Sequence, residues 1–133
     1  MRMLIAEDDF IARYVLNEML AEYGHCDVVV DGVEAVQAFR IAAEGKKPYT
    51  IIFLDIMMPN MDGIEALKRI RSIEKESGIL PGQQVKVIMT TALDDPKTVI
   101  SAYYQGGADS YLVKPITKEK IVAELRKTNL VRV

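Results

Sequence analysis

The chain has 133 residues, of which 50% are hydrophobic and 27% charged, a composition typical of globular domains that excludes disordered and collagen-like chains. Seventeen Lys and Arg residues against nineteen Asp and Glu give a net charge of -2, so we expect no direct nucleic-acid binding. One cysteine and one histidine cannot form a disulfide or a Cys/His zinc cluster. The uncharged run before Glu7 is too short for a signal-peptide core or a membrane span. We therefore expect a cytoplasmic protein without membrane insertion.

Five short apolar runs alternate with longer segments of helical periodicity, which predicts an α/β fold with a parallel sheet. Residues 51–54 are apolar without alternation, so helices are expected to cover both faces of this sheet. No linker or low-complexity tract interrupts the pattern, and we expect a single domain over residues 1–133. The expected strands are residues 3–6, 27–30, 50–54, 85–90 and 110–113.

Residues that favour helix caps mark where five expected helices begin and end. The starting residues are Asp9, Asp31, Asp62, Asp95 with Pro96, and Thr117. Glycine adopts the left-handed conformation that ends many helices, and it marks three expected ends, Gly24, Gly45 and Gly106. The third helix is expected to end near Ser77 and the fifth near Leu130.

Polar side chains gather where the expected strands end. In an open parallel sheet the ligand site lies beyond the carboxyl ends of the strands. Two carboxylates 4 Å apart repel by about 4 kcal/mol at an effective dielectric constant near 20, so a carboxylate cluster requires a cation. Oxygen ligands without Cys or His predict Mg²⁺, and a nearby lysine with a hydroxyl predicts a phosphate as the bound anion. The residues at these ends are Glu7, Asp8, Asp9, Asp55, Thr90, Thr91 and Lys114.

Four segments follow one another along the chain: residues 4–9 (LIAEDD), 54–63 (LDIMMPNMDG), 90–92 (TTA) and 111–115 (YLVKP). In sequence and in order, these segments resemble the receiver domain of two-component response regulators. The chain as a whole is similar to a stand-alone receiver of the chemotaxis type. The resemblance implies a flavodoxin-like fold of five parallel strands in the order 2-1-3-4-5, with helices on both faces.

The resemblance also implies a role for individual residues. Asp55 would accept a phosphoryl group from a histidine kinase or a histidine phosphotransfer protein. Glu7, Asp8, Asp55 and the carbonyl of Met57 would hold Mg²⁺. Lys114 would bind the phosphoryl group, with a cis peptide bond before Pro115. Thr91 and Tyr111 would form the switch that changes affinity for a downstream effector protein.

A receiver with these residues is not expected to be an enzyme that turns over external substrates. Asp55, Thr91 and Lys114 are instead expected to assist the chain's own magnesium-dependent phosphorylation and dephosphorylation. A phosphohydrolase with an aspartyl-phosphate intermediate would need a second acid two residues after the nucleophile, where this chain has Met57.

Several alternatives remain open at this stage. The chain could be a pseudo-receiver that only binds partners, or the receiver fragment of a longer response regulator with an output domain. Thr90 competes with Thr91 for the switch hydroxyl. Asp9 is favoured as a helix cap over a metal ligand.

Overall fold

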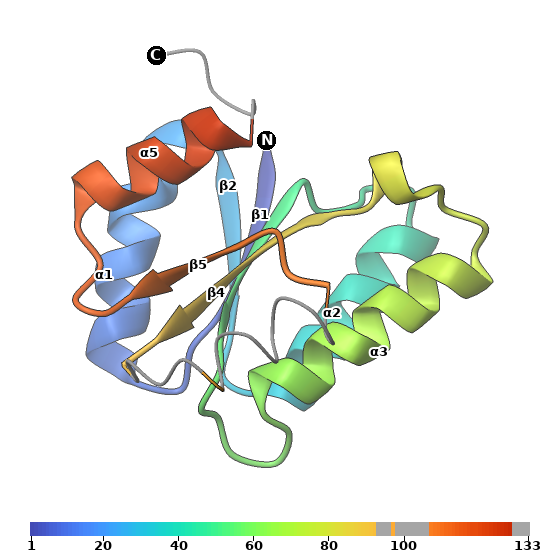
Figure 1. Cartoon of the computed structure of the whole chain (residues 1–133), viewed down its shortest axis with the longest axis horizontal. Coiled ribbons are helices and arrows are strands. Elements are labelled where there is room, and N and C mark those ends of the chain that lie inside the picture. The colour runs from blue at the N-terminus through green and yellow to red at the C-terminus, as the bar shows by residue number, and fades with distance from the viewer. Residues whose placement is uncertain (93–96, 98–106, 129–133) are drawn as a thin grey trace.

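The computed structural model describes residues 1–92, 97 and 107–128. Within these residues, five parallel strands form one sheet in the order β2-β1-β3-β4-β5 (Figure 1), which confirms the expected fold class and strand order. The observed bounds of the strands differ from the expected ones by at most two residues, and the largest difference is the earlier start of β2. The strands are β1 (Arg2–Ala6), β2 (His25–Val29), β3 (Ile51–Asp55), β4 (Lys86–Thr91) and β5 (Ser110–Val113).

Each α-helix of the described residues begins after the polar residue that was expected to start it. The four helices are α1 (Phe10–Leu20), α2 (Gly32–Glu44), α3 (Gly63–Glu76) and α5 (Lys118–Lys127). Their N-cap side chains accept hydrogen bonds from backbone N–H groups three residues later, which satisfies donors that the first helical turn leaves without partners. The caps are Asp9, Asp31, Asp62 and Thr117.

The described residues also contain two short 3₁₀ helices. Helix η1 (Ala21–Tyr23) follows α1 and ends at Gly24, and η2 (Pro81–Gln83) lies in the connection after α3. The helix expected from Asp95 to Gly106 lies outside the described residues. In the described part of the chain, no helix combines the length and the apolar character that crossing a bilayer requires.

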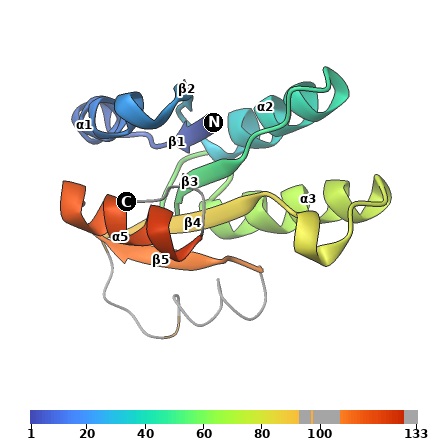
Figure 2. The ribbon, with the colours of Figure 1, turned by 90° about the horizontal axis from the view of Figure 1, so that it is seen from above.

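The sheet is the middle layer of the molecule, with helices on both faces (Figure 2). Helices α1 and α5 cover one face and α2 and α3 the other. Alternate strand residues belong to the two cores: Ile5 and Phe53 pack with α1 and α5, whereas Leu4 and Leu54 pack on the other side. Every residue of β3 is buried, which confirms that the sheet is covered on both faces.

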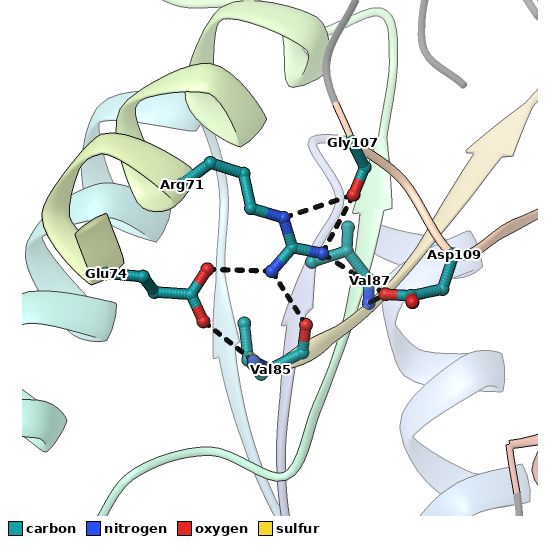
Figure 3. Close-up of polar contacts among 6 residues, drawn as sticks. All are labelled: Arg71, Glu74, Val85, Val87, Gly107 and Asp109. Atoms are coloured by element: carbon teal, nitrogen blue, oxygen red, sulfur yellow. Dashed lines mark hydrogen bonds and ion pairs between the residues drawn. The ribbon is translucent and has the colours of Figure 1, made fainter. Parts of the chain in front are cut away.

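A polar network around the buried Glu74 side chain ties α3 to the amino ends of β4 and β5 (Figure 3). The guanidinium of Arg71 donates to Glu74 Oε1 at 2.7 Å, to the Val85 carbonyl at 2.8 Å and to Asp109 Oδ2 at 3.1 Å. It also donates twice to the Gly107 carbonyl, at 3.1 and 2.9 Å. Glu74 accepts a further hydrogen bond from the Val85 N–H at 2.7 Å. The network thus ties two other chain segments to one side chain of α3.

Candidate functional site

Strand register brings the acidic residues and the lysine to the same edge of the sheet. Ala6 pairs with Leu54 across β1 and β3, so Glu7 and Asp55 lie level with each other. Thr91 pairs with Val113 across β4 and β5, so Lys114 follows directly beyond this pair. The convergence predicted from the strand ends is therefore present, and it brings side chains from β1, β3 and β5 together.

Lys114 lies between two buried carboxylates. Its Nζ donates to Asp55 Oδ2 at 3.2 Å and also to Glu7 Oε1. The side chains of Glu7 and Asp55 are each only 4% exposed, whereas Asp8 is exposed to solvent. One carboxylate oxygen from each of Glu7, Asp8 and Asp55 lies within 4.8 Å of the others. Three hard oxygen donors with one side open to solvent fit a divalent cation such as Mg²⁺.

The protonation of this cluster is shaped by burial and by mutual charge. Burial raises the pKa of Glu7, and the hydrogen bond to Asp55 and the charge of Asp55 raise it further, while Lys114 acts in the opposite direction. Burial lowers the pKa of Lys114, but the hydrogen bond to Glu7 and the charge of Asp55 outweigh it, and the net pKa is raised. The raised pKa keeps Lys114 positively charged at neutral pH, in contact with the carboxylates of Glu7 and Asp55.

The loop after β3 packs tightly against Asp55. The N–H of Met57 donates to Asp55 Oδ1 at 3.3 Å, and the N–H of Gly63 donates to the Ile56 carbonyl at 2.8 Å. A Cβ atom at Gly63 would come within 2.1 Å of the Asp55 carbonyl oxygen, so only glycine fits there. The side chain of Met57 is 61% exposed beside this carboxylate.

The two residues implied as the switch lie on neighbouring strands. Thr91 is fully buried at the end of β4, one residue beyond Thr90, which pairs with Asp55. Tyr111 in β5 pairs with Met89 in β4 and is 41% exposed. Thr90 is buried as well, so burial does not decide between the two threonine hydroxyls.

The structure also shows contacts that the sequence analysis missed. Arg13 donates to the Glu7 carbonyl at 2.7 Å and to the Asp8 carbonyl at 3.4 Å, so it holds the backbone of the acidic pair from the first turns of α1. Its position, one helical turn after the Asp9 N-cap, is the signal that could have identified it. Asp9 acts as that cap, accepting from the Ala12 N–H at 3.2 Å, as favoured. The peptide bond between Lys114 and Pro115 is cis, as the resemblance implies.

An apolar groove of about 250 Å³ adjoins the acidic cluster. Glu7 and Lys114 form its polar end, and its walls come from α1 and from the segment after β5. Phe10 and Tyr14 on α1 are also largely exposed. Exposed apolar surface of this kind is typical of protein-binding sites. The apolar wall residues include Ile11, Val15, Met19, Pro115 and Ile116.

Comparison with known proteins identifies the family of this chain. The sequence model of the response regulator receiver domain matches residues 3–126. The chemotaxis protein CheY of Bacillus subtilis is 32% identical over 127 residues, covering 96% of both chains. The histidine kinase mak2 of Schizosaccharomyces pombe is 37% identical over 125 residues, which are 93% of this chain but 5% of that kinase.

Solved structures of receiver domains are also similar to this chain. A CheX–CheY complex from Borrelia burgdorferi with BeF₃ and Mg²⁺ matches with a TM-score of 0.81 and 28% identity, covering 98% of this chain and 90% of that one. The complex of the Saccharomyces cerevisiae phosphotransfer protein Ypd1 with the Ssk1 receiver domain matches with a TM-score of 0.84 and 25% identity, covering 98% and 89%. With its sheet order, acidic cluster and family match, the chain belongs to the response regulator receiver domain family of phosphoacceptor signalling switches.

Proposed function

We propose that Asp55 is the phosphoacceptor of this receiver, and that its phosphorylation controls affinity for an effector protein. The observation that carries the proposal is the contact of the Lys114 ammonium with Asp55 and Glu7, beside the exposed carboxylate of Asp8. A buried carboxylate with a fixed cation and spare metal ligands is suited to attack a phosphoryl group and to stabilise the product.

In the proposed reaction, a carboxylate oxygen of Asp55 attacks the phosphorus atom of a phosphohistidine. The P–N bond breaks as the P–O bond forms, and the imidazole leaves as the product of the donor. Lys114 already contacts Asp55 and would donate a hydrogen bond to a phosphoryl oxygen once Asp55 is modified. Glu7, Asp8, Asp55 and the Met57 carbonyl would hold Mg²⁺, which when bound supplies positive charge to the phosphoryl oxygens. The chain thus assists its own phosphorylation.

The switch is proposed to use Thr91 and Tyr111. Thr91 ends β4 at the edge where Asp55 lies, and Tyr111 stands on the adjacent strand with much of its side chain at the surface. A hydroxyl that moves toward a phosphoryl oxygen would change the packing available to the tyrosine. The surface presented by β5 would then favour a different protein.

The phosphodonor is proposed to be a histidine kinase or a histidine phosphotransfer protein of the cytoplasm. A donor must bring its phosphohistidine to Asp55, and the groove along α1 offers it apolar surface directly beside Glu7 and Lys114. The Ypd1–Ssk1 complex supports this class of partner.

Phosphorylation is expected to require both Mg²⁺ and the Asp55 carboxylate. Intact mass after incubation with acetyl phosphate should show one added phosphoryl group for the native chain with Mg²⁺, and none with EDTA. Asp55→Asn should stay unmodified because an amide is a poor nucleophile, while Asp62→Asn, in the same loop, should be modified like the native chain.

Equal modification of Asp55→Asn and the native chain would overturn the assignment of Asp55. If the native chain gains no phosphoryl group from acetyl phosphate or from a phosphorylated histidine phosphotransfer protein, the pseudo-receiver alternative is correct.

A further inference from the structure

The loop between β3 and α3 is anchored to the first residues of α2. The N–H of Gly32 donates to the Met61 carbonyl at 3.1 Å, and Asn60 Nδ2 donates to Asp31 Oδ2 at 2.8 Å. A Cβ atom at Gly32 would come within 2.3 Å of the Met61 oxygen, so the two segments are in direct backbone contact. This loop is the one that carries Met57.

Asp31 has a partner for each of its carboxylate oxygens. Oδ1 accepts from the Glu34 N–H at 2.8 Å and thereby caps α2, while Oδ2 accepts from Asn60. Asp31 is buried, and the hydrogen bond from the Glu34 N–H, with that from Asn60, lowers its pKa. The residue is therefore a charged, fixed acceptor at neutral pH, and one side chain holds both a helix start and a loop.

Asn60 adopts a backbone conformation that needs support. Its φ of 67° lies in the left-handed region, where asparagine is tolerated better than most residues. The Met61 N–H donates to the Pro59 carbonyl at 2.7 Å, which closes a three-residue turn around Asn60. The hydrogen bond to Asp31 holds this turn in place from outside the loop.

We propose that Asp31 is a positioning residue for the phosphorylation site, acting through Asn60. By fixing the turn at Asn60, it sets the path of the loop and hence the place of Met57, whose N–H binds Asp55 and whose carbonyl is a proposed Mg²⁺ ligand. The inference rests on the proposed function and deepens it, because it assigns Mg²⁺ affinity in part to a residue outside the ligand set.

Asp31→Ser tests this with little effect on the helix start, because serine is also a good N-cap. Its hydroxyl oxygen can still cap α2, but the shorter side chain has no second oxygen to accept a hydrogen bond from Asn60. We expect the Mg²⁺ dissociation constant of the unphosphorylated protein, measured by calorimetry, to rise about three- to tenfold. The Met57 amide should exchange faster with solvent in metal-free protein.

Asp62→Ser is the matched control. Asp62 caps α3 with a hydrogen bond of the same 2.8 Å length to the Glu65 N–H, and we expect its substitution to change Mg²⁺ affinity less than twofold. The double variant Asp31→Asn with Asn60→Asp reverses donor and acceptor across the contact. It should restore at least part of the Mg²⁺ affinity, which a general loss of stability would not allow.

The outcomes separate this inference from the proposed function. Unchanged Mg²⁺ affinity in Asp31→Ser, an equal loss in Asp62→Ser, or no restoration in the double variant would overturn the role of Asp31 alone. Failure of the native chain to bind Mg²⁺ would overturn the proposed Mg²⁺ site and this inference together.

Discussion

Lys114→Met is expected to slow phosphorylation by acetyl phosphate about 100- to 1,000-fold at saturating Mg²⁺, the usual effect of removing one donor to a developing anion. Lys114 is the charged donor in contact with Asp55, and methionine keeps most of its apolar stem without the ammonium. The rate should be followed by intact mass over time. A rate within about threefold of the native chain, under the same conditions, would contradict the role of Lys114.

The same variant should bind Mg²⁺ more tightly, by about three- to tenfold. The ammonium competes with the metal ion for the oxygens of Glu7 and Asp55, and its removal leaves two buried carboxylates without a cation. Lys118→Met is the control because Lys118 pairs with Glu22 on an exposed surface, and it should change neither rate nor affinity. Slower phosphorylation with tighter metal binding is a combination that unfolding cannot produce.

Arg71→Met is expected to lower the free energy of unfolding by about 3–5 kcal/mol, the cost of removing one partner from a buried ion pair. The Glu74 side chain is 1% exposed and would lose its cation. The Gly107 carbonyl would lose both of its Arg71 donors, and the Asp109 carboxylate would lose its ion pair with Arg71. The network lies at the amino ends of β4 and β5, away from Asp55, so phosphorylation of the folded fraction should be unchanged.

Urea unfolding followed by circular dichroism measures this loss. Arg69→Met is the control on the same helix, since the pair of Arg69 with Glu65 is about half exposed on both sides. It should change the free energy of unfolding by less than about 0.5 kcal/mol. Equal losses in the two variants would show that the buried network contributes no more than a surface pair.

Much of the fold could be predicted from the sequence because its determinants are local. Apolar runs and cap residues such as Asp31 and Asp62 lie next to the elements that they define, and the expected strands are correct to within two residues. The Arg71 network could not be predicted. Arg71 and Glu74 occupy helical positions typical of a solvated surface pair, and their burial depends on Val85 and Gly107, which the fold brings from other segments.

The site was predictable in outline for a different reason. Parallel strands share a carboxyl edge, so the residues at the carboxyl ends of β1, β3 and β5 had to come close together. The individual contacts were not predictable: Lys114 and Glu7 are 107 residues apart, and their hydrogen bond depends on side-chain conformation. Because such contacts depend on side-chain conformation, the sequence analysis placed Glu7 at the metal alone. It also did not identify the hydrogen bond between Asn60 and Asp31.

The most direct measurement locates the phosphoryl group. The native chain is incubated with Mg²⁺ and acetyl phosphate, treated with borohydride, which reduces an aspartyl phosphate to homoserine, and then digested for peptide mass spectrometry. Asp55 as the acceptor predicts homoserine at position 55, only when both Mg²⁺ and phosphodonor are present. Reduction at Asp8 or Asp9, or a stable phosphate on His25 or on a hydroxyl side chain with position 55 unmodified, would contradict it.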